Sequence, residues 1–107
     1  MNALKWDKNF ALEQAADDAE LLEELLEIFK QSMQSDLQLI EQGLAEGSTA
    51  KIGGAAHSIK GAAASLGIMG IHDIAKRVEE DCRAGGLDVA RDNFGVLQAL
   101  LTELLAL

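Results

Sequence analysis

The sequence predicts an all-α fold, an up-down antiparallel four-helix bundle with a short N-terminal helical extension. Leu and Ala dominate the 107 residues, there is no Pro, and β-branched residues are few, a composition that favours helices. Apolar residues recur at steps of three and four in four long runs. The breaks between these runs are short, so consecutive helices should be antiparallel neighbours. The length allows one hydrophobic core, and we expect residues 1–107 to form a single domain.

The first two helices are each expected to begin at an aspartate. Asp7 can cap a short helix that runs through about Ala16. Asp17 or Asp18 can then cap a long amphipathic helix that stops at Gly47, because glycine tolerates the left-handed conformation just past a helix end. The inward stripe of this long helix is predicted to be Leu22, Leu25, Phe29, Met33, Leu37, Ile40 and Leu44, with Lys30 among the outward polar residues.

Three further helices complete the bundle. Ser48 or Thr49 can cap the next helix, which ends at Gly67. The helix after it stops at Gly85-Gly86, and Asp88 can begin the last one. The inward stripes predicted for these helices are, in order, Ile52, Ala56, Ile59, Ala63 and Leu66; Ile68, Ile71, Ala75, Val78 and Cys82; and Ala90, Phe94, Leu97, Leu101 and Leu104.

Charge and cysteine content exclude several classes of function. The 18 acidic and 9 basic residues give a formal net charge of −9, which disfavours nucleic acid and anionic lipid as partners. The single cysteine, Cys82, allows no internal disulfide, and its helical spacing from Val78 suggests a buried structural thiol. Nothing resembles a signal peptide, and no apolar run approaches the roughly 20 residues that a membrane span needs. We therefore expect a cytoplasmic protein that does not insert into membranes.

The helix before Gly67 departs from the pattern of a plain bundle helix. Its outward face carries small residues around one histidine and one lysine: Gly53, His57, Lys60, Gly61 and Ala64. Each glycine inside a helix costs about 1 kcal/mol relative to alanine, so an opposing advantage is required. The simplest such advantage is clearance for the surface of another protein, and it makes Gly53 and Ala64 candidate partner-binding residues. Tight helix packing could explain Gly54, but it does not explain a histidine and a lysine on the same small face.

The chemistry of these side chains fits phosphoryl transfer. A neutral imidazole has a free nitrogen lone pair near cellular pH, and that nitrogen can attack phosphorus. In so acidic a chain the anionic phosphoryl group needs a local cation, which Lys60 can supply from one turn away. We therefore predict that His57 is the phosphoacceptor, with Gly61 leaving room for the partner. The other histidine, His72, has no such clearance and is interpreted as a solvated surface residue.

Several segments resemble a known family. The stretch from Ala56 to Gly67, Ala-His-Ser-Ile-Lys-Gly-Ala-Ala-Ala-Ser-Leu-Gly, resembles the signature of the histidine-phosphotransfer (Hpt) domain family: His, two residues, Lys-Gly, then an apolar-Gly pair. Leu21–Phe29 is similar to the second helix of that family, and Val78-Glu79 with Arg83–Gly85 is similar to the end of its fourth. The resemblance therefore covers nearly the whole chain.

The resemblance implies a phosphorelay intermediate whose partners are response-regulator receiver domains within a sensor histidine kinase system. It implies that His57 takes a phosphoryl group from a receiver's aspartyl-phosphate and passes it to another receiver. Lys60 would lie near the phosphate, Gly61 would give the receiver room, and Glu79 could orient the imidazole through a hydrogen bond. No cofactor is implied for this chain, with Mg²⁺ needed only on the partner receiver. The Gly53-Gly54 pair stands where the family carries bulkier or charged residues.

Three other classes of function fit less well. A di-iron bundle needs Glu three residues before His, but Gly54 and Met69 occupy these positions before the two histidines. A helical adaptor without chemistry could use the small face as a docking groove, yet it leaves the His-x-x-Lys-Gly spacing accidental. A hydrolase or kinase lacks both a nucleophile–base set and a glycine-rich phosphate loop, so the chain should depend on a partner for phosphate rather than act as an enzyme on ATP.

Overall fold

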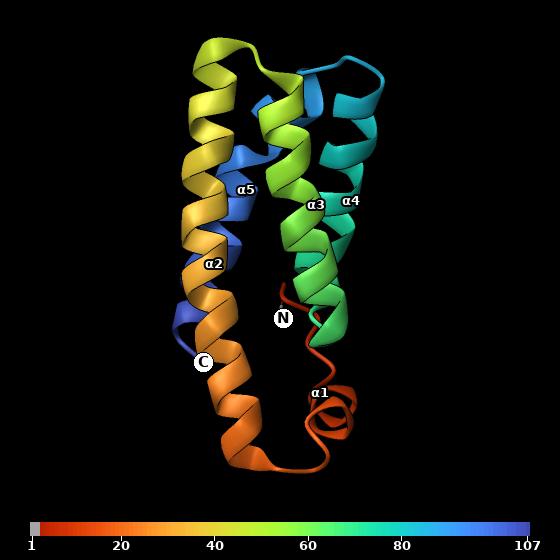
Figure 1. Ribbon diagram of the computed structural model, residues 1–107, viewed down its shortest axis with the longest axis vertical. Helices are drawn as coiled ribbons and strands as arrows, with labels where there is room; N and C mark the ends of the chain where they lie inside the picture. Colours follow the sequence, from red (N-terminus) through yellow and green to blue (C-terminus); the bar gives the residue numbers. More distant parts are fainter. Residues whose placement is uncertain (1–2) are drawn as a thin grey trace.

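The computed structural model describes residues 3–107, and this part of the chain forms five α-helices and no strand. The all-helical prediction is therefore confirmed. The helices are α1 (Lys8–Gln14), α2 (Ala19–Glu46), α3 (Thr49–Ser65), α4 (Met69–Arg83) and α5 (Asp88–Leu105). Helices α3 and α5 each pack against both α2 and α4, which closes a four-helix bundle with α1 below one end (Figure 1).

The helix caps follow the local sequence rules. The Asp7 carboxylate accepts from the backbone N–H of residue 10, and the Asp18 carboxylate accepts from the N–H groups of residues 20 and 21. At the start of α3 the cap is Ser48 rather than Thr49, with its hydroxyl accepting from the N–H of residue 51. Gly47 has φ +69°, the left-handed conformation that ends α2. These caps fix where α1, α2 and α3 begin.

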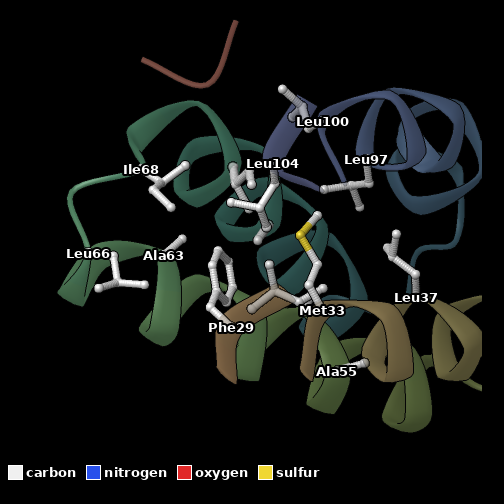
Figure 2. Close-up of a cluster of buried hydrophobic side chains, with 14 of the residues drawn as sticks. Phe29, Met33, Leu37, Ala55, Ala63, Leu66, Ile68, Leu97, Leu100 and Leu104 are labelled. Atoms are coloured by element: carbon white, nitrogen blue, oxygen red, sulfur yellow. The ribbon is translucent and has the colours of Figure 1, made fainter. Parts of the chain in front are cut away.

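A cluster of buried hydrophobic side chains forms the core (Figure 2), and the stripes predicted for α3 and α4 are buried in full. The stripes predicted for α2 and α5 are partly wrong: Leu25, Leu44, Phe94 and Leu101 are only half-buried, whereas Leu26 and Leu100 belong to the core. At Leu26 and Leu100 the residue that faces the core is therefore the neighbour of the predicted one, which reflects how each helix is rotated within the bundle.

Lys30 also differs from its prediction. It was expected on an outward face of α2, but it is only 8% exposed. Its Nζ donates to Glu27 Oε1 at 3.0 Å and to the backbone carbonyl of Leu107 at 3.5 Å. The aliphatic stem is buried against the core while the ammonium reaches polar partners at the end of the bundle, a common arrangement for lysine.

The N-terminal segment is tied to the connection between α3 and α4. The Trp6 indole N–H donates to the Leu66 carbonyl at 3.0 Å, and the Gly70 N–H donates to the Leu4 carbonyl at 2.8 Å. Leu4 is 2% exposed, so its side chain belongs to the core. These contacts hold in place the C-terminal end of α3, which follows His57. Within residues 3–107, no helix is long and apolar enough to cross a membrane.

Candidate functional site

His57 stands on the solvent side of α3 with its side chain 64% exposed. A Cβ added to Gly61, one turn further along, would meet nothing within 4 Å. The same is true of Gly54, whereas a Cβ on Gly53 would contact Cys82 of α4 at 3.4 Å. The interpretation of Gly54 as a packing residue is therefore wrong, because Gly54 leaves open space beside the histidine. Gly53 lies nearer the neighbouring helix, and it lines the groove beside His57 together with Gly54.

Glu79 of α4 is the centre of the site, with its side chain only 3% exposed. Its Oε2 lies 2.6 Å from His57 Nδ1 and 2.8 Å from Arg83 Nη2, and its Oε1 accepts from Lys60 Nζ at 2.5 Å. Burial alone would raise the pKa of this carboxyl group. The hydrogen bond from Lys60, aided by those of His57 and Arg83, outweighs burial and lowers the pKa below its ordinary value of 4.5. Glu79 is therefore ionised at neutral pH.

An ionised carboxylate accepts hydrogen bonds but cannot donate one. The 2.6 Å contact with Glu79 therefore requires the hydrogen of the neutral His57 ring to be on Nδ1. The lone pair is then on Nε2, which has no hydrogen-bond partner among residues 3–107. The buried carboxylate fixes the tautomer and the ring orientation, and it leaves a nucleophilic nitrogen directed at solvent.

Two cations accompany the histidine, and both are held by the same carboxylate. Lys60 was predicted from the sequence, but its ammonium contacts Glu79 rather than standing free, and its side chain is 26% exposed. Arg83 was not predicted as a site residue, and its side chain is 69% exposed. Its position four residues after Glu79 on the same helix was the signal that could have identified it. Two positive charges and one negative charge leave the cluster net positive beside Nε2.

An open groove of about 340 Å³ lies next to His57, between α3 and α4. It extends from Thr49 to His57 on one side and from Glu79 to Arg83 on the other. Cys82 lies at its base and is 6% exposed, which agrees with a buried structural thiol. Burial raises the pKa of this thiol, so it stays protonated and unreactive.

The remaining candidates lie apart from this groove. Ala64 is half-buried further along α3 and does not line it. His72 contacts the carboxylate of Asp73 at 3.0 Å, and its side chain is 21% exposed, less than a solvated histidine would be. Across residues 3–107, no group of three or more His, Cys, Asp or Glu side chains is placed to hold a metal ion.

The geometry describes a helical bundle that presents one oriented imidazole on an open surface, and not an enclosed substrate pocket. Comparison with protein families agrees: the model of the Hpt domain family matches residues 24–107. Because the match covers most of the chain, the protein belongs to the Hpt domain family. Hpt domains are phosphotransfer modules, not kinases, and they interact with receiver domains in the phosphorelays of two-component systems. No curated protein and no solved structure gives a significant match.

Proposed function

We propose that His57 accepts a phosphoryl group on Nε2 from the aspartyl-phosphate of a receiver domain and passes it to a second receiver. The observation that carries this proposal is the 2.6 Å contact between Nδ1 and the buried carboxylate of Glu79, combined with an exposed Nε2 that has no partner among the described residues. A helical adaptor without chemistry would have no use for an imidazole held in one tautomer.

The transfer balances without a cofactor on this chain. The Nε2 lone pair forms the new N–P bond while the O–P bond to the receiver aspartate breaks, and the aspartate leaves as a carboxylate. The imidazole then carries a positive charge because its Nδ1 proton stays in place. The Glu79 carboxylate offsets that charge at 2.6 Å, and the onward step to a second receiver reverses the same changes. The Mg²⁺ needed to stabilise the aspartyl-phosphate belongs to the receiver.

Lys60 and Arg83 supply the positive charge that the phosphoryl oxygens need. Both contact Glu79, and Arg83, whose side chain is 69% exposed, has open space in which to turn toward a phosphoryl group on Nε2. Gly54 and Gly61 leave open space on either side of His57 along α3, so a receiver can bring its aspartate close to the ring. In this scheme a sensor histidine kinase system loads the relay.

The test is phosphoryl transfer from a panel of radiolabelled, phosphorylated receiver domains in the presence of Mg²⁺. We expect label that is acid-labile and stable to alkali, as an N–P bond is, and no label on His57→Gln. His72→Gln is the matched control and should be labelled like the parent. If His57→Gln accepts label as fast as the parent, the proposal is wrong.

A further inference from the structure

A second groove lies on the other side of α4 and shares no residue with the one beside His57. It lies between α4, α5 and the N-terminal segment and has a volume of about 700 Å³. Leu100 and Ile74 form part of its apolar lining, together with Val96, which is 43% exposed. Large apolar side chains left accessible between two helices are the usual lining of a site for a partner helix.

The charges around this groove set it apart from the rest of the surface. Of the nine basic residues, six have a carboxylate or aromatic partner: Lys8, Lys30, Lys51, Lys60, Arg83 and Arg91. The other three, Lys5, Lys76 and Arg77, have no charged or hydrogen-bonding side-chain partner within residues 3–107, and all three line this groove. In a chain of net charge −9, three neighbouring cations without a partner among the described residues favour the binding of an anionic partner at this groove.

Two carboxylates also line the groove without neutralising it. Asp73 is four residues before Arg77, and Glu80 is four residues after Lys76, which are spacings suited to helix ion pairs. Neither pair closes in the part of the chain that the structure describes, and Asp73 contacts His72 instead. The cations therefore remain in the majority at the groove, three against two.

The anion is not a phosphate or a nucleic acid. The backbone N–H groups at the start of α4, which could otherwise bind a phosphate, donate instead to the N-terminal segment: Met69 to the Lys5 carbonyl and Gly70 to the Leu4 carbonyl. No aromatic side chain lines the groove to stack a base. The net charge of −9 opposes every strongly anionic partner at long range, so binding here depends on contacts with the cations and apolar side chains of the groove. The ligand that matches the groove is therefore a partner segment that carries separate carboxylates around an apolar stripe.

We propose that this groove, formed by Lys5, Lys76, Arg77 and the apolar residues Ile74, Val96 and Leu100, binds an acidic amphipathic helix of a partner protein. The apolar stripe of that helix packs on Val96 of α5 and Ile74 of α4, and its carboxylates pair with the three cations. Because α4 presents Glu79 and Arg83 to the other groove, the partner and a receiver can bind at the same time. The groove thus holds the partner protein without covering His57.

The test uses a synthetic acidic peptide of about 18 residues, long enough to form a helix, with a leucine stripe and glutamates elsewhere. A counterpart has every glutamate replaced by lysine. Each is titrated into the full ¹⁵N-labelled chain and followed by ¹H–¹⁵N NMR. We expect the acidic peptide alone to shift the amide signals of residues 73–80 and 96–100. Shifts confined to other helices, equal binding of the basic peptide, or no shift at millimolar peptide would overturn the proposal.

Charge-reversal variants distinguish binding at the groove from a general effect of the net charge of the chain. Lys76→Glu/Arg77→Glu should weaken the acidic peptide about tenfold or more, and Lys8→Glu/Arg91→Glu, an equal charge change elsewhere, should weaken it much less. Val96→Asp removes apolar contact at an exposed position and should also weaken binding, with the thermal midpoint of each variant confirming the fold. Equal loss in both double variants would contradict the groove.

Other occupants are tested in the same series. Binding to vesicles of phosphatidylcholine and phosphatidylglycerol that is lost in Lys76→Glu/Arg77→Glu would assign the groove to a membrane and overturn the proposal. A dimer seen by light scattering and lost in the same variant would assign it to a second copy, with the same consequence. Phosphotransfer to His57 should be unchanged in Lys76→Glu/Arg77→Glu, so failure of this proposal and failure of the proposed function are distinguishable.

Discussion

Replacement of Glu79 by glutamine tests the centre of the site with almost no change of shape. The amide oxygen can still accept a hydrogen bond from the His57 Nδ1–H, so the ring keeps its orientation. What disappears is the negative charge, held 2.6 Å from the imidazole on a side chain that is 3% exposed. Glu79→Gln therefore separates the electrostatic contribution of this residue from its geometric one.

The size of the effect follows from the hydrogen bond that the charge strengthens. Hydrogen bonds to ionised groups are roughly twice as strong as neutral ones, a difference of about 1–1.5 kcal/mol. The carboxylate charge stabilises the ring most when the ring becomes positive during transfer. A free-energy change of about 1.4 kcal/mol corresponds to a tenfold change in rate. The release of Lys60 and Arg83 acts in the opposite direction. Both are partly solvated, so their contribution is smaller, of the order of 0.2–1 kcal/mol.

We therefore expect transfer to Glu79→Gln to be about threefold slower than to the parent, measured in single-turnover reactions with a phosphorylated receiver. Glu80→Gln is the matched control, because it removes the same charge from the next residue, which is exposed and has no ion pair among the described residues. Its rate should equal that of the parent. Equal rates for Glu79→Gln and the parent would refute the claim that the carboxylate charge assists transfer.

The same variant has a pH signature in stability. The folded protein lowers the pKa of Glu79, so its stabilising contribution is complete above the ordinary value of 4.5 and is lost as pH falls through the lower folded pKa. Urea unfolding should show Glu79→Gln about 1–2 kcal/mol less stable than the parent at pH 7, with the difference shrinking on acidification below pH 4.5. A difference that is constant from pH 7 to pH 3 would contradict the assignment.

Five further substitutions test the rest of the site and the fold. Lys60→Ala and Arg83→Ala should each slow transfer by several-fold without unfolding the helices, and the double variant should be slower than either; unchanged rates would remove both cations from the mechanism. Gly61→Leu should retain its helical circular dichroism but bind receivers more weakly, which calorimetry can measure, and parental affinity would contradict the clearance argument. Gly70→Ala should cost about 2–4 kcal/mol in urea unfolding, because the added Cβ collides with the N-terminal backbone and displaces a buried leucine. Gly95→Ala, where a Cβ meets nothing, should instead stabilise the chain by about 0.5–1 kcal/mol.

The order of elements and their caps could be predicted from the sequence because they depend on local chemistry. The carboxylates of Asp7 and Asp18 cap the helices that follow them, and Gly47 takes the left-handed conformation. The residues of each helix that face the core could not all be predicted in the same way. Leu100 is buried and Leu101 is only half-buried because of how α5 is rotated against α2 and α4, and that rotation depends on the assembled bundle.

The rotation of α3 was also beyond local reasoning. Alanine and glycine occupy both its inner and outer faces, so hydrophobic contrast, the signal that normally fixes a helix face, is weak. This weakness is why the prediction allowed tight packing for Gly54, which faces open space. His57 and Lys60 were located correctly on the outer side because a charged and a polar side chain are expensive to bury, which restores the contrast at those two positions.

Glu79 shows why a site is harder to predict than a fold. It is the residue after Val78, which belongs to the inward stripe of α4, and a glutamate at such a position ordinarily points to solvent. Its burial is tolerated because His57 and Lys60, 22 and 19 residues earlier, donate to it together with Arg83. A buried carboxylate that satisfies three donors would be a poor choice for stability alone, since an apolar residue there would need no partners. Its presence is better explained by the charge that the imidazole acquires when it carries a phosphoryl group.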